Sequence, residues 1–242
     1  MGFDVNGVRC LLAAKAAGVN FERSAMIGRQ KMHLLPQSLR DLMNKFGYQD
    51  SEQQAQRILN EDDRFAEPFL RLLGAVHIDS FDASAYEKAS CIHDMNTPIP
   101  DHYKGKYSVV IDGGTLEHVF NFPLAIKNCM EMIEVGGFYI GVTPANNFMG
   151  HGFYQFSPEL YFRVFSPVNG FITETIHIFE DVPNAQWVRL TDPDILGKRV
   201  EMVNSRPAYI AIQARKVGNK DVFSEYPQQS DYSAIWKQTE PE

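Results

Sequence analysis

The sequence predicts an α/β protein with a mostly parallel β-sheet and helices on both faces. One observation is a strand–helix–strand pattern over residues 107–142, which opens with the hydrophobic run Tyr107–Ile111. Its uninterrupted β-branched character suits a strand buried on both faces of a parallel sheet. A second observation is that three successive predicted strands are followed by an aspartate, at Asp82, Asp94 and Asp112. Open α/β sheets bind ligands at the carboxyl ends of their strands, so these positions also predict a site.

The first part of the chain predicts a helix over residues 5–17, because apolar side chains recur there on one face. A short strand over residues 23–27 follows. Residues 31–74 then predict amphipathic helices in several pieces, and we interpret them as a helical insertion after the first strand. The helical pieces cover residues 38–46, 51–59 and 66–73.

The strand–helix–strand unit over residues 107–142 has a turn or helix-boundary residue at the end of each element. Asp112 and Gly113 end its first strand, and Pro123 suits the first turn of the helix that follows. The double glycine at 136–137 is expected to stop that helix, so the second strand is predicted over residues 138–142. Strand, acidic glycine turn, helix and strand in this order form a βαβ unit.

The stretch YSVVIDGGTLEHVFNFPLAIKNCMEMIEVGGFYIGVTPANN, residues 107–147, resembles the fourth strand, helix and fifth strand of class I S-adenosylmethionine-dependent methyltransferases. The resemblance rests on Leu116-Glu117-His118 followed by Gly136-Gly137. It implies a Rossmann-like class I methyltransferase fold with a mostly parallel, seven-stranded sheet, whose last two strands, near residues 171–180 and 208–214, are antiparallel. The domain is expected over residues 1–217, with the insertion at about 31–74 and a loosely packed polar tail over 218–242.

The same resemblance implies S-adenosyl-L-methionine as the cofactor and assigns residues to it. The turn after the first strand approaches the methionine end of the cofactor, Asp82 accepts hydrogen bonds from the ribose, and Asp94 contacts the adenine. Asp79 competes with Asp82 but falls in mid-strand. The cofactor-binding residues expected in this way are Gly28, Arg29, Gln30, Asp82, Asp94, Met95, Asp112 and Gly113.

A loop over residues 149–157 carries a histidine between two glycines and is expected to be mobile. Methyl transfer to an oxygen needs a base, and histidine titrates near neutral pH. His151 is therefore the first candidate for a catalytic residue and His118 the second, with an orienting role. The run HGFYQFSPEL also resembles bacterial methyltransferase-like proteins associated with surface polysaccharide genes, which points to a sugar context. Ser157 is expected to cap the next helix.

A metal-assisted variant remains open, with Asp112, Glu117 and His118 as oxygen and nitrogen ligands. We nevertheless expect no metal, because carboxylates at strand ends need none. The chain has no hydrolase elbow, phosphate-binding loop or zinc spacing.

Composition restricts the class of protein. The 242 residues suffice for one sizeable core, and the net charge of −7 argues against a general nucleic-acid surface. Three scattered cysteines, the absence of a long apolar stretch and the absence of a signal-peptide pattern predict a cytoplasmic protein. The sequence gives no indication of oligomeric state.

The function expected from these observations is methyl transfer from S-adenosylmethionine to an oxygen of a small polar acceptor, such as a sugar or glycan intermediate. Two alternatives stay open. The chain could be a catalytically inactive binding or scaffold protein in a biosynthetic complex, which its single glycine at the first turn favours. It could also bind a nicotinamide or a nucleotide-sugar, although no Gly-x-Gly-x-x-Gly follows any predicted strand.

Overall fold

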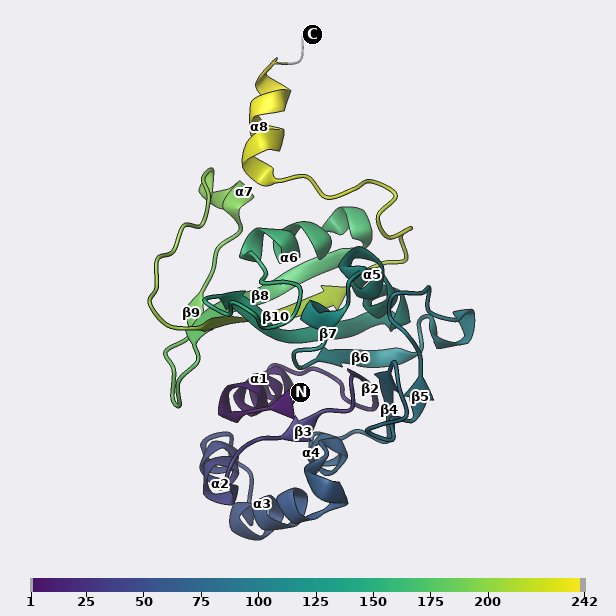
Figure 1. Ribbon diagram of the computed structural model, residues 1–242, viewed down its shortest axis with the longest axis vertical. Helices are drawn as coiled ribbons and strands as arrows, with labels where there is room; N and C mark the ends of the chain where they lie inside the picture. The colour runs from purple at the N-terminus through teal and green to yellow at the C-terminus, as the bar shows by residue number, and fades with distance from the viewer. Residues whose placement is uncertain (1, 240–242) are drawn as a thin grey trace.

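The computed structural model describes residues 2–239, with every side chain in that range except those of 234, 235 and 237–239. Its centre is an eight-stranded mixed sheet with the strand order β5-β4-β2-β6-β7-β10-β8-β9 (Figure 1). The strands of this sheet are β2 (Arg23–Ile27), β4 (His77–Asp82), β5 (Cys91–Ile92), β6 (Tyr107–Asp112), β7 (Ile133–Asn146), β8 (Phe171–Glu180), β9 (Val188–Arg189) and β10 (Ala208–Lys216). A separate parallel pair joins β1 (Gly2–Phe3) to β3 (Lys31–Met32).

Helices surround the sheet. They are α1 (Val5–Ala16), α2 (Pro36–Lys45), α3 (Ser51–Asn60), α4 (Glu67–Leu72), α5 (Phe122–Met132), α6 (Pro158–Val164), α7 (Pro193–Leu196) and α8 (Ser230–Thr239). Short 3₁₀ turns are η1 (Asp62–Arg64), η2 (Asp101–Tyr103), η3 (Leu116–His118) and η4 (Pro167–Asn169). None of the described helices is long and apolar enough to cross a membrane.

The strand order reverses beside β2. From β2 the chain adds β4 and β5 on one side and then returns to add β6 and β7 on the other, all parallel, before β10 inserts antiparallel between β7 and β8. This is the Rossmann-like class I methyltransferase arrangement, so the predicted fold class is confirmed. Two details differ. The sheet gains β9 as an eighth strand, and β8 runs in the direction of β7, so only β10 and β9 are reversed.

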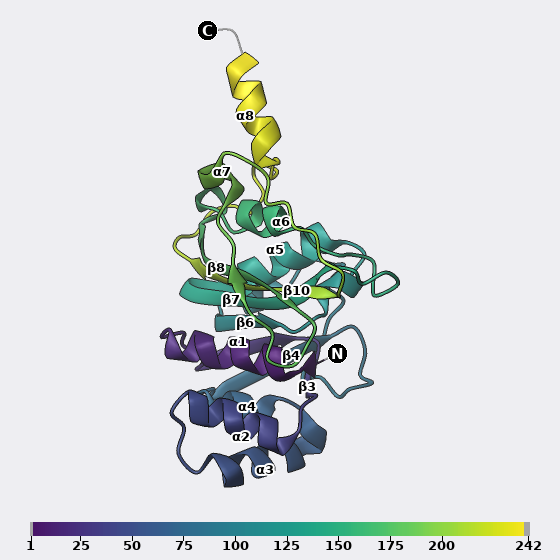
Figure 2. The same ribbon diagram turned by 90° about the vertical axis from the view of Figure 1, so that its left-hand side faces the viewer.

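The two faces of the sheet have separate cores because successive strand residues point to opposite sides. Val110 of β6 packs in a cluster with α5 and α6, whereas its neighbours Val109 and Ile111 pack against α1–α4. The two helical layers lie on opposite sides of the sheet in both views (Figures 1 and 2). Burying each large apolar side chain contributes about 1.5–3 kcal/mol, which explains why the hydrophobic strand β6, buried along its whole length, is central.

The helical insertion packs below the sheet. Its three helices α2–α4 bury apolar side chains against α1, and together they form the lower layer of the molecule (Figure 2). The residues that carry this packing include Leu39, Met43, Ile58 and Phe69, each with no exposed surface. The insertion therefore contributes to the core of one sheet face.

The double glycine lies inside β7 and does not precede it. Helix α5 ends at Met132, and β7 begins directly at Ile133. Gly136 has a φ of +91°, and a Cβ on Gly137 would lie 2.9 Å from the carbonyl oxygen of Ser108. The glycines thus allow a bend and a close approach to β6 within the strand, which a helix-stop interpretation of the sequence missed.

The described part of the expected loosely packed tail, residues 218–239, makes defined contacts with the rest of the molecule. Val222 is only 2% exposed and joins the α5 side of the core. Helix α8 begins at Ser230, whose backbone N–H donates to Glu159 Oε1 at 2.8 Å. Beyond that anchor α8 projects away from the sheet (Figure 1).

Asp79, the competitor for the ribose position, has a structural role. Its Oδ2 accepts hydrogen bonds from the Tyr107 hydroxyl at 2.7 Å and from Lys106 Nζ at 3.0 Å. Burial alone would raise the pKa of Asp79, but these hydrogen bonds and the Lys106 charge outweigh it and hold the pKa below the ordinary value.

We expect Asp79→Asn to lower the free energy of unfolding by about 1–2 kcal/mol at pH 7, because hydrogen bonds to a charged group contribute about 1.5–3 kcal/mol and this carboxylate is partly exposed. A lowered pKa in the folded state stabilises the protein fully above the ordinary value of 3.8, and the stabilisation is lost as the pH falls below it. Urea unfolding at pH 7 and pH 3 measures the difference, which should shrink at pH 3.

Asp101→Asn is the matched control. Asp101 also lies 3.0 Å from a lysine, Lys104, but its side chain is 95% exposed, so the change should stay within about 0.5 kcal/mol. An equal loss for Asp79→Asn at both pH values would contradict the assigned role of its charge.

Candidate active site

The fold places the predicted cofactor residues along one edge of the sheet. Because β5, β4, β2 and β6 are parallel neighbours, their carboxyl ends lie side by side. Asp94, Asp82, Gly28 and Asp112 follow these strands in that spatial order. The four strand ends span three interstrand spacings, which together measure roughly 14 Å. Residues far apart in the sequence therefore line one edge in the order in which the resemblance assigns them to adenine, ribose and methionine.

The turn after β2 holds its two bulky side chains in place. Gly28 has a φ of +72°, and its N–H donates to the Phe81 carbonyl at 2.7 Å. The Arg29 guanidinium turns toward the helical insertion, where it pairs at 2.7 Å with both Glu67 and Asp62. Its interaction with these carboxylates makes Arg29 a link between the turn and the insertion.

Gln30 fills the point where the strand order reverses. It is buried, and its Nε2 donates to the Ile27 carbonyl at 2.6 Å and to Thr115 Oγ1 at 3.0 Å. Gln30 Oε1 is buried and has no hydrogen-bond partner among the described residues. A Cβ on Gly113 would lie 2.6 Å from the Phe3 ring and 3.1 Å from Gln30 Oε1, so Gly113 is required by this close packing. Phe3 and Gln30 thus occupy the space beside β2 and β6.

The aspartates of β4 and β5 adopt turn conformations. Asp82 Oδ1 accepts from the Ser84 N–H at 2.9 Å. Asp94 Oδ1 accepts from the Asn96 N–H at 2.9 Å, and this bond together with one from the Asn96 side chain lowers the pKa of Asp94. Met95 is 4% exposed and packs in the core. Among the described residues, the side-chain hydrogen bonds of both aspartates involve Oδ1.

Asp112 is enclosed at the end of β6. Its Oδ1 accepts from the Thr115 N–H at 2.8 Å, and its Oδ2 accepts from the Tyr139 hydroxyl at 3.3 Å. Burial raises the pKa of Asp112 to about 6, although these hydrogen bonds oppose the shift. The side chain of Asp112 therefore organises the turn, and its oxygens already have partners.

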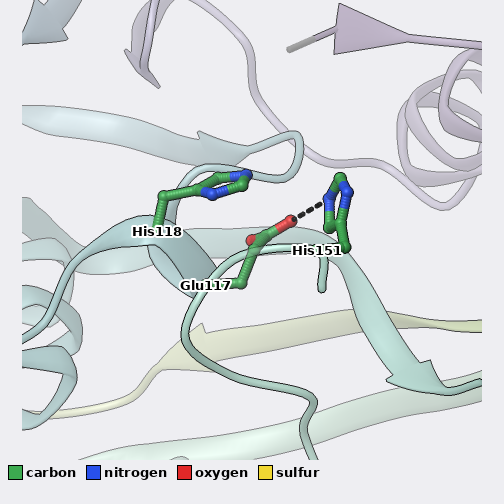
Figure 3. A group of neighbouring side chains, drawn as sticks. All are labelled: Glu117, His118 and His151. Atoms are coloured by element: carbon green, nitrogen blue, oxygen red, sulfur yellow. Dashed lines mark ion pairs between the residues drawn. The ribbon is translucent and has the colours of Figure 1, made fainter. Parts of the chain in front are cut away.

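Three titratable side chains converge next to this turn. Glu117 lies between the imidazoles of His118 and His151 (Figure 3). Its Oε1 is 3.7 Å from His151 Nε2, its Oε2 accepts from Thr143 Oγ1 at 3.4 Å, and the two histidine rings are 5.1 Å apart between centroids. We call Glu117, His118 and His151 the His–Glu–His cluster.

Backbone contacts bring His151 to its partners. The Phe153 N–H donates to the Glu117 carbonyl at 2.8 Å. Gly152 has a φ of +73°, and a Cβ there would lie 2.8 Å from that carbonyl and 3.1 Å from His118 Nδ1. Gln155 Oε1 accepts from the Phe148 N–H at 2.7 Å. The loop, which the sequence predicted to be mobile, is thus tied to the Leu-Glu-His turn.

The environment shifts the pKa values of two cluster members. Glu117 is 1% exposed, and burial, with a smaller effect of the nearby Asp112 charge, raises its pKa to about 8. Burial and the neighbouring His151 lower the pKa of His118. His118 is consequently neutral at pH 7, with a free lone pair on one ring nitrogen.

A cavity of about 190 Å³ opens beside the cluster, between the start of α1 and the carboxyl ends of β6, β7 and β8. Its ionisable lining comprises three carboxylates and two further proton-exchanging groups, with no lysine or arginine among the described lining residues. These side chains are Asp4, Glu117, Asp181, His151 and Tyr209. Burial and the charge of Asp4 raise the pKa of Asp181. The described lining of the cavity is therefore acidic, with carboxyl groups and no compensating lysine or arginine.

Sequence reasoning found part of this site. The two histidines were predicted, and the structure brings them together. Glu117 was considered only as a metal ligand, and Asp181 was overlooked although it directly follows β8, the same signal that identified the other aspartates. Tyr209 gave no sequence signal, because a tyrosine in a strand is ordinarily a packing residue.

Fold and site together define a Rossmann-like class I methyltransferase fold with a titratable cluster at the carboxyl edge of its sheet. No protein-family model matches the chain, and no curated protein matches it. Among solved structures, a candidate methyltransferase from Bacillus halodurans C-125 is 11% identical, with 85% of this chain and 98% of that chain covered and a TM-score of 0.47. An S-adenosylmethionine-dependent methyltransferase from Mesorhizobium loti is 14% identical, with 87% and 99% covered and a TM-score of 0.44. TehB from Haemophilus influenzae is 12% identical, with 86% and 61% covered and a TM-score of 0.44.

We expect Gly152→Ala to separate His151 from the other cluster members, because the added Cβ cannot occupy a position 2.8 Å from the Glu117 carbonyl. The ring resonances of His118 and His151 should shift in NMR spectra, and the free energy of unfolding should fall by about 1–3 kcal/mol. Gly197→Ala is the control, since Gly197 has a similar φ of +64° but nothing near its Cβ position. Unchanged histidine resonances in Gly152→Ala would contradict the proposed positioning role.

Proposed function

We propose that the protein transfers a methyl group from S-adenosylmethionine to an oxygen of a small polar acceptor, such as a sugar or glycan intermediate. The observation that supports this most is the His–Glu–His cluster at the carboxyl edge, next to the turn after β6 and open to a cavity of about 190 Å³. It combines an exposed imidazole with a buried carboxylate close to the proposed cofactor edge.

The residues along the edge fit the cofactor in three respects. Asp82 and Asp94 present carboxylates at neighbouring strand ends, and their described side-chain hydrogen bonds involve Oδ1. Gln30 Oε1 is a buried acceptor without a partner among the described residues, and an ammonium group would satisfy it. Bound S-adenosylmethionine supplies an activated methyl group on a sulfonium centre.

The chain's own residues then bind and activate the acceptor. The cavity holds the hydroxyl of the acceptor next to the proposed cofactor edge, so that donor and acceptor react as positioned groups. His151 Nε2 accepts the hydroxyl proton, and Glu117 in its ionised form, with Oε1 3.7 Å away, stabilises the resulting imidazolium. His118 orients the acceptor from the other side of Glu117.

The alternative, a catalytically inactive binding protein, is favoured by one observation. Phe3 and Gln30 fill the space beside β2 and β6, where the strand order reverses and ligands of such sheets bind. Under this alternative these side chains close the cofactor site permanently. Under the proposed function Gln30 accepts a hydrogen bond from the cofactor.

Calorimetric titration with S-adenosylmethionine and S-adenosylhomocysteine separates these two functions. We expect micromolar binding that weakens at least tenfold in Asp82→Ala and in Asp94→Ala, because each loses a carboxylate acceptor. Asp101→Ala, an exposed aspartate on η2, should bind as the wild-type protein does. Absence of binding by the wild-type protein would favour the inactive alternative.

The variant His151→Ala tests whether His151 accepts the proton of the acceptor hydroxyl. With an acceptor found by screening hydroxyl compounds, kcat should fall by about 10²–10⁴-fold, whereas cofactor affinity should stay nearly unchanged. The rate of S-adenosylhomocysteine formation measures this effect. His77→Ala, at the amino end of β4, should keep full activity. A kcat within threefold of wild type for His151→Ala would exclude the proton-accepting role.

A further inference from the structure

We infer that the His–Glu–His cluster is a binding site for a divalent first-row transition-metal cation. Each of its three side chains offers one ligand atom, and these atoms all lie within 4.8 Å of one another. Two imidazole nitrogens and one carboxylate oxygen form a ligand set that zinc, iron, cobalt and manganese accept. The sequence alone grouped Glu117 and His118 with Asp112, but the structure replaces Asp112 by His151.

Asp112 is unsuitable as a ligand because its oxygens are already engaged by Thr115 and Tyr139. Glu117 differs, since the partner of its Oε1 among the described residues is His151 Nε2 at 3.7 Å. That separation exceeds a hydrogen bond, yet it suits two ligands of one ion. Two atoms bound to a tetrahedral metal at about 2.1 Å lie about 3.4 Å apart.

The three donor atoms already lie close to the spacing that a tetrahedral metal ion requires. Starting from separations of up to 4.8 Å, the donor atoms must move together by at most about 1.4 Å to reach tetrahedral spacing. Glu117 is fixed by its burial, whereas His118 and His151 are exposed and can adjust their side-chain torsions. Gly152 keeps the loop backbone next to Glu117, so the adjustment does not require a new loop position.

The surrounding charge favours a cation independently of the ligand geometry. Asp4 and Asp181 line the same cavity as Glu117, and no lysine or arginine lies among its described lining residues. A bound divalent cation would favour the ionised form of Glu117, which among the described residues forms no ion pair with a lysine or arginine and has His151 Nε2 3.7 Å from its Oε1. The cavity leaves the outer positions of the metal open to water or to a hydroxyl group.

A bound cation changes which group activates the acceptor. His151 then serves as a ligand and cannot accept a proton, and the cation lowers the pKa of the hydroxyl that coordinates it, with the proton released to water. This catalytic consequence rests on the proposed methyl transfer, whereas cation binding does not. Metal removal distinguishes activation of the acceptor by His151 from activation by the cation, because a chelator abolishes activity only if the cation is the activating group.

Metal binding can be tested without cofactor or acceptor. The protein is first treated with a chelator, and Zn²⁺ and Co²⁺ are then titrated separately by calorimetry, with the visible absorption of bound Co²⁺ as a second readout. We expect one equivalent to bind, and the affinity to weaken at least tenfold in Glu117→Gln, His118→Ala and His151→Ala, since each removes one of three ligands.

His77→Ala is the matched control, because His77 is an exposed histidine at the opposite edge of the sheet. It should bind the metal as the wild-type protein does. His151 is exposed on a loop, so His151→Ala should fold normally, and added Zn²⁺ should raise the melting temperature of the wild-type protein but not of this variant.

Two outcomes would overturn the inference. One is the absence of stoichiometric Zn²⁺ or Co²⁺ binding by the wild-type protein. The other is binding that survives His151→Ala or Glu117→Gln unchanged, which would locate the ion elsewhere. Neither outcome affects the titration with S-adenosylmethionine, so failure of the metal site and failure of the proposed function remain distinguishable.

Discussion

The parallel pairing of β6 with β2 on one side and β7 on the other is the constraint on which the rest of the structure depends. Because all three strands run in the same direction, their carboxyl ends meet at one edge. The strand order reverses at this place, so the connections leave on opposite sides and open the edge to ligands. The Asp112 turn, the Leu-Glu-His turn and the loop after β7 all begin at this edge.

This edge contains polar groups that a stable core would avoid. Gln30 has a buried carbonyl oxygen without a partner among the described residues, and Glu117 is a buried carboxylate whose pKa is raised to about 8. Leaving such groups poorly paired costs stability, on the order of 1–3 kcal/mol each. The apolar side chains that fill the neighbouring strands carry no such cost in stability. Unpaired groups concentrated at a strand edge are typical of a site that a ligand completes.

The same three side chains support two kinds of chemistry. Under the proposed function, the imidazole of His151 accepts a proton and an ionised Glu117 stabilises its charge. Under the inferred metal site, both histidines and Glu117 would act as ligands, and the cation would take the activating role. The acidic lining of the cavity suits either proposal, because ionised carboxylates there would stabilise an imidazolium as well as a metal cation. In both cases Gly152 is decisive, since it lets the loop backbone reach the Glu117 carbonyl.

The sequence by itself determined the local elements and the strand ends. Apolar periodicity located α1 and β2, the Ser157 side chain caps α6 as predicted, and the aspartates after β4, β5 and β6 lie at one edge. These features depend on residues that are neighbours in the sequence and on the common direction of parallel strands. Only the tertiary structure decided that Arg29 pairs with the insertion, that Gln30 fills the reversal point and that His151 meets Glu117. Such contacts join distant segments, and their geometry depends on loop paths and on single glycines, which no local pattern encodes.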